Sequence, residues 1–389
     1  MISLNELTIL PGRGAAVLCR VIGEYIEQLQ ELPFSFKDRH AIGGNCWLIA
    51  FIKEKDTALH DFLKQKQSRT EAYIFRAKIE QDGTLIRMPD IQLPSFILNQ
   101  TLAIKDDVLY LGGFEVVREN KKNFSKVNKG EMAGFFDLTL EEPVWHSLPL
   151  PIDMQEGKSI DDVLVYDDKL VLVDNIMYPK YLFEYDITDP LSPVATKTID
   201  LPNNGTYEHI HRGSINSNWM ALLSGGVGRA GSSEYVSVFS LPNYEQVFTI
   251  DYLRSAFDML ESDKFTSLEQ ELEKARNTVT LYDFAIAGDN VLIACGHHGI
   301  GRFALPELLQ QYQEKQNQIE AEFKDVNRYS RYTYGRSYEL SGIYQDSQHL
   351  CKVPELEEVH KLVPLTDGRV VAVSYGETNL KLEYKVLQF

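Results

Sequence analysis

The feature that most constrains this sequence is a series of four short apolar segments between Ser159 and Pro202. Each segment is rich in β-branched and aromatic residues, and Asp, Asn or Pro follows each one. The segments are Val163–Tyr166, Leu170–Val173, Tyr181–Ile187 and Val194–Leu201. Runs of four to eight such residues between turn-forming residues are typical of β-strands. The stretch therefore predicts four antiparallel strands connected in sequence order.

Four short strands within such a length correspond to one blade of a β-propeller. The second strand ends in a small loop, and the third runs into the letters YDITDP. On these letters, residues 159–202 resemble the LVIVD-type propeller repeat. The resemblance is clear only in this stretch and is weaker in the rest of the chain. It implies an all-β fold.

Extending the pattern along the chain predicts a single β-propeller domain over residues 1–389, with four-stranded antiparallel blades. Six blades are expected, and seven is the alternative. The six predicted blades cover about 36–94, 95–151, 159–202, 203–253, 278–344 and 359–386. Leu4–Leu10 is expected to pair with Leu380–Val386 and complete the last blade, because closing the ring removes exposed sheet edges.

Three segments interrupt the blade pattern with apolar residues at helical spacing. They lie near residues 14–32, 254–277 and 307–324. Residues three and four apart share one face of a helix, so each segment predicts an inserted amphipathic helix. For residues 14–32 a long strand is the alternative.

Charge and local composition exclude several classes of function. The 56 acidic residues outnumber the 39 basic ones, and the net charge of −17 disfavours binding to nucleic-acid phosphates. No apolar run approaches the roughly 18 residues of a membrane span. The N-terminus lacks the basic region of a secretory signal, and the four cysteines are scattered without metal-binding spacing. These features predict a soluble cytoplasmic protein with reduced thiols.

No catalytic motif with a local signature occurs, so candidate site residues must come from the repeat itself. Counting about eight residues back from each second strand gives one polar residue per blade at one level of the first strands: Arg39 or His40, Gln100, Asp161, His211, Asp283 and Lys361. His209 shares the side of His211 because alternate strand residues face the same way. With the residues of the connecting loops, the predicted ligand-binding set is Asp161, His209, His211, Asp283, His297, His298, His360 and Arg229.

The predicted histidines suggest metal binding, and a separate aromatic segment suggests binding to a protein partner. Imidazole and carboxylate groups could hold a divalent metal ion, with His209, His211 and His297 as ligands. Polar residues at strand ends near solvent, however, need no ligand. The segment 327–344 combines tyrosine with arginine, types enriched in protein interfaces, although an outer strand would look similar. Its predicted partner-binding residues are Tyr329, Tyr332, Tyr334, Arg331 and Arg336.

Three classes of function fit these observations. The first is a non-catalytic platform that binds a protein or peptide partner, which the inserted segments and the lack of catalytic motifs favour. The second is a hydrolase or lyase with a metal-assisted or His/Asp site at the channel rim. The third is a structural or sensing domain without a dedicated ligand. The choice among them rests on the site, because a propeller fold alone does not determine function.

Overall fold

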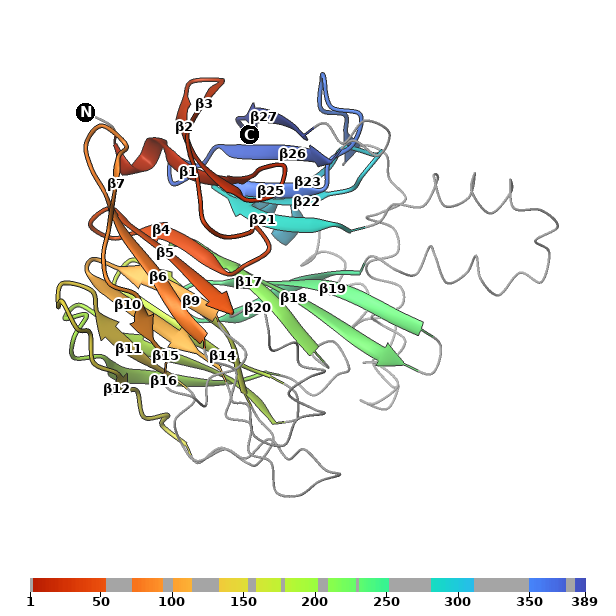
Figure 1. Ribbon diagram of the computed structural model, residues 1–389. Coiled ribbons are helices and arrows are strands. Elements are labelled where there is room, and N and C mark those ends of the chain that lie inside the picture. The colour runs from red at the N-terminus through yellow and green to blue at the C-terminus, as the bar shows by residue number, and fades with distance from the viewer. Residues whose placement is uncertain are drawn as a thin grey trace, which may run out of the picture. The chain divides into compact units, whose positions relative to one another are not determined.

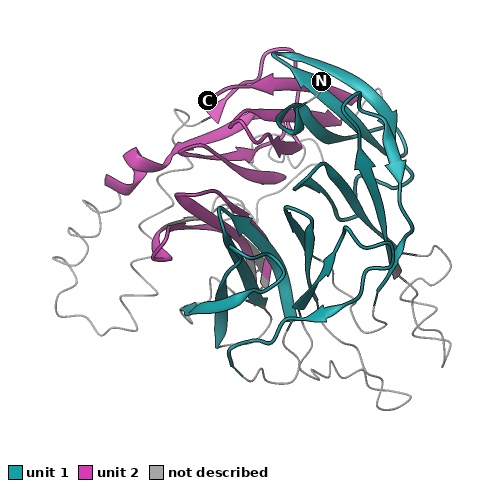
Figure 2. Ribbon diagram, turned by 90° about the vertical axis from the view of Figure 1, so that its left-hand side faces the viewer, with its two compact units in different colours: residues 1–202 teal, residues 203–389 magenta. Residues whose placement is uncertain are grey.

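The chain folds as an all-β protein, a β-propeller with seven blades (Figure 1). The computed structural model describes residues 3–53, 72–93, 101–113, 133–152, 159–175, 179–201, 209–228, 231–251, 281–310, 350–375 and 382–389. Within these residues the strands form seven antiparallel sheets, which fall into two compact units, residues 1–202 and 203–389 (Figure 2). The alternative of seven blades is therefore correct, and the expected six is one too few.

The first unit contains four sheets. A short 3₁₀ helix, η1 (Leu4–Glu6), precedes the first of them. The sheets consist of β1 (Leu7–Pro11), β2 (Ala16–Ile22) and β3 (Tyr25–Glu31); β4 (His40–Gly43), β5 (Trp47–Lys53), β6 (Ala72–Ile79), β7 (Leu85–Arg87) and β8 (Ile91–Gln92); β9 (Thr101–Lys105), β10 (Val108–Gly112), β11 (Ala133–Asp137) and β12 (His146–Ser147); and β13 (Ser159–Tyr166), β14 (Lys169–Asn175), β15 (Lys180–Asp186) and β16 (Val194–Leu201).

The second unit contains three sheets. They consist of β17 (His209–Ile215), β18 (Trp219–Gly228), β19 (Gly231–Ser240) and β20 (Glu245–Asp251); β21 (Asp283–Ala287), β22 (Asn290–Ala294), β23 (Ile300–Ala304) and β24 (Leu350–Cys351); and β25 (Lys361–Pro364), β26 (Val370–Tyr375) and β27 (Leu382–Leu387). In both units the first strand of each sheet contacts the first strand of the following sheet. No helix in the described residues is long and apolar enough to cross a membrane.

The blades share one backbone contact at the end of the third strand. In the sheet of β13–β16, which has the four strands predicted for residues 159–202, the N–H of Ile187 donates to the carbonyl of Asp168 at 2.9 Å. Leu138 makes the equivalent bond to Asp107, and Leu305 to Asp289, each at 2.8 Å. All three donors have fully buried side chains. In each case the residue directly after the third strand is hydrogen-bonded to the turn between the first two strands, and this bond fixes the position of that turn.

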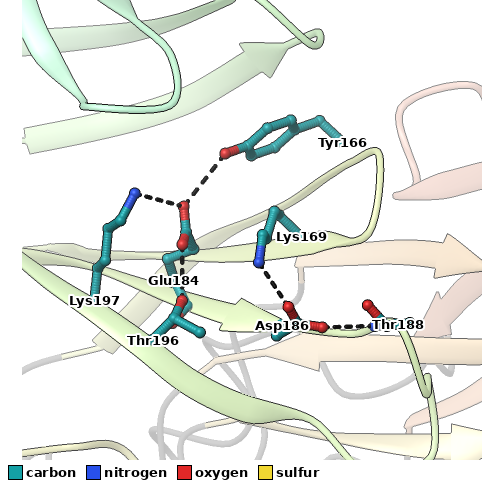
Figure 3. Close-up of polar contacts among 7 residues, drawn as sticks. All are labelled: Tyr166, Lys169, Glu184, Asp186, Thr188, Thr196 and Lys197. Carbon is teal, nitrogen blue, oxygen red and sulfur yellow. Dashed lines mark hydrogen bonds and ion pairs between the residues drawn. The ribbon is translucent and has the colours of Figure 1, made fainter.

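Side-chain contacts stabilise the same sheet on both sides of β15 (Figure 3). Glu184 is buried, and its carboxylate accepts hydrogen bonds from the hydroxyls of Tyr166 at 3.3 Å and Thr196 at 2.7 Å. Two residues later, Asp186 accepts from Lys169 Nζ at 2.8 Å and from the Thr188 N–H at 2.9 Å. These two donors lower the pKa of Asp186 far below its usual value. The two acidic residues of β15 therefore have local structural partners.

A repeated Trp–Asp contact joins neighbouring blades. The indole Nε1 of Trp47 donates to Asp107 Oδ1 at 2.7 Å, and that of Trp219 donates to Asp289 Oδ1 at 2.8 Å. In each case the tryptophan begins the second strand of one blade, and the aspartate lies in the first turn of the next. Burial alone would raise the pKa of Asp107, but hydrogen bonds from Trp47 and Asn45 and the charge of Lys78 outweigh it, and the pKa is lowered.

The prediction of a helix near residues 14–32 is wrong. The segment forms the antiparallel hairpin of β2 and β3, and Gly23 in its turn has a φ of +59°. β2 pairs with β1 without a register shift, and it buries Ala16 and Leu18 on one face and Cys19 and Val21 on the other. A strand buried on both faces lacks the alternation of apolar and polar residues by which strands are recognised. This explains both the error and the missing blade.

The N-terminal strand also differs from its prediction. β1 pairs with β2, with Leu7 opposite Arg20, and so belongs to the first sheet rather than completing the sheet of β25–β27. Residues 305–310 are helical, with Leu308 buried against the core of the second unit, so the described part of the predicted 307–324 segment is a helix. The remainder of that segment, and the predicted helix at 254–277, lie outside the described residues.

Candidate functional site

Polar side chains lie at one level of the first strands and connect neighbouring blades. In the first unit, Thr101 Oγ1 donates to Asp162 Oδ1 at 2.5 Å and accepts the N–H of Val163 at 3.1 Å. In the second unit, the buried Asp283 forms ion pairs with Arg212 and, at 3.4 Å, with Lys361. Asp283 Oδ2 also accepts the Leu362 N–H at 3.0 Å. These side chains therefore satisfy edge-strand donors of the next blade, which buried backbone groups require.

This row is displaced by one residue from the predicted one in three blades, the first being that of Thr101, which follows the predicted Gln100. Asp161 and His211 are each the extra residue of a β-bulge, between Ile160 and Asp162 in one sheet and between Ile210 and Arg212 in another. The residues that join the row are the following ones, Asp162 and Arg212. Asp161 instead accepts a 2.5 Å hydrogen bond from the hydroxyl of Ser159 in its own strand.

A second group of polar residues surrounds a buried carboxylate in the second unit. Glu358 is 4% exposed, and imidazoles from two different segments approach its two oxygens. His297 Nε2 lies 2.5 Å from Oε1, and His360 Nε2 lies 2.9 Å from Oε2. The His360 contact does not have hydrogen-bond geometry, and Oε2 has no hydrogen-bond donor among the described residues. Burying a carboxylate is costly without donors, so this acceptor is an unusual feature of the fold.

The backbone holds both histidines in place. His297 lies in the turn after β22, and an antiparallel bridge joins Gly296 to Val359 through two hydrogen bonds of 2.9 and 3.0 Å. The carbonyl of His297 accepts a hydrogen bond from Lys352 Nζ. His360 Nδ1 accepts the N–H of Tyr375 at 3.2 Å. An accepting Nδ1 carries no proton, and the other ring nitrogen, Nε2, lies near Glu358 without hydrogen-bond geometry.

Two exposed tyrosines flank His360. The ring of Tyr282 meets it edge-on at a centroid distance of 4.8 Å, and the ring of Tyr375 lies at 5.7 Å. Tyr282 is 50% exposed and Tyr375 39%, both unusual for large aromatic residues in this chain. Burial, together with the charge of Asp283, raises the pKa of Tyr375. We call Tyr282, His297, Glu358, His360 and Tyr375 the tyrosine–histidine cluster.

Gly296 sets the position of Tyr282. Its φ is +55°, and a Cβ at this position would lie 2.7 Å from Tyr282 Cε2. Glycine alone combines a left-handed backbone with this close approach at little cost. The turn therefore forms one wall against which the tyrosine ring packs.

The structure brings three predicted site residues into this region: His297 and His360 contact Glu358, and Asp283 contacts Lys361, the neighbour of His360. His298 is half-buried, and its N–H donates to Cys295 O within the same turn. Asp161 lies in the first unit. His209 and His211 are on β17, but their side chains are not described. Arg229 and the residues Tyr329, Arg331, Tyr332, Tyr334 and Arg336 lie outside the described residues.

Metal binding by the predicted histidines gains no geometric support. The described residues contain no group of three or more His, Cys, Asp or Glu side chains that could hold a metal ion. Glu358 was absent from the predicted site, although it precedes His360 by two residues. Residues two apart share a side in extended backbone, so this spacing was the available signal.

Comparisons with known proteins add no family. No family model matches the chain, and no curated protein matches it. Among solved structures it is similar to YjhT (TM-score 0.43, 11% identity, covering 75% of this chain and 87% of that one). It is also similar to the computationally designed Ika8 protein (TM-score 0.38, 11% identity, 77% and 68%) and to a GH32 beta-fructofuranosidase of Bombyx mori (TM-score 0.34, 7% identity, 55% and 49%). None of these likenesses supports an inference about function.

Proposed function

We propose that the protein is a non-catalytic interaction platform that binds a protein or peptide partner through the tyrosine–histidine cluster. The observation that carries the proposal is the exposure of Tyr282, His297 and Tyr375 on a framework held by inter-segment hydrogen bonds. Tyrosine is enriched at interface anchors because it offers a large rigid surface with a polar end. Pre-organised side chains also lose less conformational entropy on binding.

The experiment compares partner capture by three forms of the full chain. The surface variant carries Tyr282→Ala and Tyr375→Ala, and the control carries Tyr25→Ala, which removes a 67% exposed tyrosine from the β2–β3 hairpin. Proteins retained from an extract of the source cells are identified, and binding is then measured with the purified partner. We expect the unchanged chain and the control to bind it equally and the surface variant at least about tenfold more weakly. Equal binding by all three forms would reject the platform.

The contact between His297 and Glu358 favours one further candidate, a hydrolase or lyase. A histidine oriented by a carboxylate is a common acid–base arrangement, and the exposed His297 ring can be reached from solvent. The test is hydrolysis of a panel of esters, phosphate esters and glycosides by the full chain and by its His297→Ala variant. Turnover that disappears in the variant would establish catalysis. A cytoplasmic location and the exclusion of nucleic acid remain predictions from sequence.

A further inference from the structure

We propose that the tyrosine–histidine cluster recognises a basic side chain, the ammonium group of lysine or the guanidinium group of arginine, in an extended peptide segment. This inference rests on the proposed function and names the chemical group that anchors the partner. It follows from the unfilled acceptor on Glu358, from the aromatic faces beside it and from the charge of the protein.

The first argument is the state of the buried carboxylate. Asp283 is paired with both Arg212 and Lys361, so permanent charges offset it. The ion pairs of Glu358 among the described residues are with imidazoles alone, and its Oε2 atom lacks a hydrogen-bond donor there. The Nδ1 atom of His360 accepts the Tyr375 N–H. A ligand that carries several N–H donors and a positive charge would complete this site.

The second argument is the aromatic surroundings. Aromatic rings attract cations to their faces because of the ring quadrupole, and tyrosine is among the preferred partners. Tyr282 and Tyr375 lie on either side of His360 and expose large parts of their rings. The raised pKa of Tyr375, caused by burial and by Asp283, also indicates a negative potential at its phenol. That potential disfavours an anionic ligand here.

The third argument concerns access to Glu358. His297 is 51% exposed and contacts Oε1, whereas the 12% exposed His360 covers Oε2. The exposed ring is the one that can swing aside, so the incoming cation enters past His297 and donates to the carboxylate of Glu358, whose Oε2 atom lacks a hydrogen-bond donor among the described residues. The net charge of −17 favours the approach of a basic segment at long range. If binding came only from the net negative charge of the protein, replacing one carboxylate such as Glu358 would hardly change it.

The test uses fluorescein-labelled nine-residue peptide pools, with random flanking positions and a fixed central Lys, Arg, Glu or Leu. Binding to the full chain is measured by fluorescence anisotropy at about 0.15 M salt, where surface charges more than about 8 Å apart are screened. We expect the Lys and Arg pools to bind at least about tenfold more tightly than the Glu and Leu pools.

Variants assign the effect to the cluster. Glu358→Gln should reduce binding of the basic pools to that of the Leu pool, whereas Glu355→Gln, a change at a 76% exposed carboxylate, should leave it unchanged. Tyr282→Ala or Tyr375→Ala should weaken it about three- to tenfold, a check that holds even if Glu358→Gln fails to fold.

Three other outcomes would overturn the inference, and each would show which part of it is wrong. If Glu358→Gln folds and binds the basic pools as the unchanged chain does, the attraction is non-specific. If the Leu or Glu pool binds as tightly and Tyr282→Ala abolishes that binding, the platform stands but the anchor is not a cation. If no pool binds the unchanged chain, both the basic anchor and a peptide-binding platform are rejected.

Discussion

Replacing Arg76 by methionine should destabilise the first unit by about 3–4 kcal/mol. Arg76 lies on β6 with no exposed surface, and its guanidinium group donates four hydrogen bonds to backbone carbonyls. One goes to Pro89 at 2.7 Å, and three reach the following blade at Leu138, Leu140 and Glu141, at 3.0, 2.8 and 2.5 Å. The side chain thus joins two blades through the loop that follows β11.

The magnitude follows from the burial of each bond. The bond to Leu138 is fully buried, and a hydrogen bond from a charged donor contributes about 1.5–3 kcal/mol. The other three are partly buried, and water can replace them in the variant, so they contribute about 0.5 kcal/mol each. Burial lowers the pKa of Arg76, which shows that the charge is costly to desolvate, and removing it returns part of the loss.

The assay is equilibrium unfolding in urea, followed by far-UV circular dichroism at neutral pH. Arg87→Met is the matched control, because Arg87 lies in the same sheet on β7, is 58% exposed, and contacts Asp90 and the ring of Phe75 within its own blade. It should change stability by less than about 0.5 kcal/mol. Arg76→Lys should lose nearly as much as Arg76→Met, because one ammonium group cannot reproduce the planar fork. A loss below about 1 kcal/mol for Arg76→Met would refute the assigned role.

Three further predictions concern single residues. The pKa of Asp107 is lowered in the folded state, so its contribution is present above the free-aspartate pKa of about 4 and is lost as pH falls through the folded value. The destabilisation caused by Asp107→Asn in urea unfolding should therefore shrink from pH 6 to pH 3, and a constant difference would contradict it. Burial raises the pKa of the Cys19 thiol to about 12, so alkylation at pH 8, mapped by mass spectrometry, should be at least about 100-fold slower there than at the exposed Cys351. Comparable rates would show that Cys19 is accessible. Gly296→Ala should destabilise the chain by about 1–2 kcal/mol in thermal melts and weaken partner binding, because its φ is positive and its Cβ would displace the Tyr282 ring. Unchanged melting and binding would disprove this packing.

The strands could be predicted from the sequence because each one is a short run of β-branched and aromatic residues next to turn-forming residues. The four predicted strands are present as β13–β16. β13 ends before Asp167 as predicted, whereas β14 continues through Asp174 and Asn175, which were expected to follow it. Two predictions near the N-terminus were wrong, those for residues 14–32 and for β1. β2 is buried on both faces, so its apolar residues do not alternate with polar ones, and the segment was predicted to be a helix, which removed one blade from the count. The prediction for β1 depended on a pairing partner, which no local pattern encodes.

The candidate site likewise has features that could be predicted from the sequence and features that could not. The level of polar residues on the first strands was predictable from the repeat, and Asp283 lies in it. Asp161 and His211 were each predicted for the row but are the extra residues of bulges, and a bulge adds one residue without a signal in the amino-acid types. Sequence singled out His297 and His360, 63 residues apart, but not the carboxylate that joins them.

The sequence by itself therefore determined the all-β class, the order of most strands and the polar level of the first strands. These properties depend on side-chain alternation and turn chemistry within a few residues of each other. Only the tertiary structure decided the number of blades, the bulges and the meeting of Tyr282, Glu358 and Tyr375 around one histidine. Those features arise from packing between segments far apart in the chain, where backbone hydrogen bonds, rather than residue types, select the register.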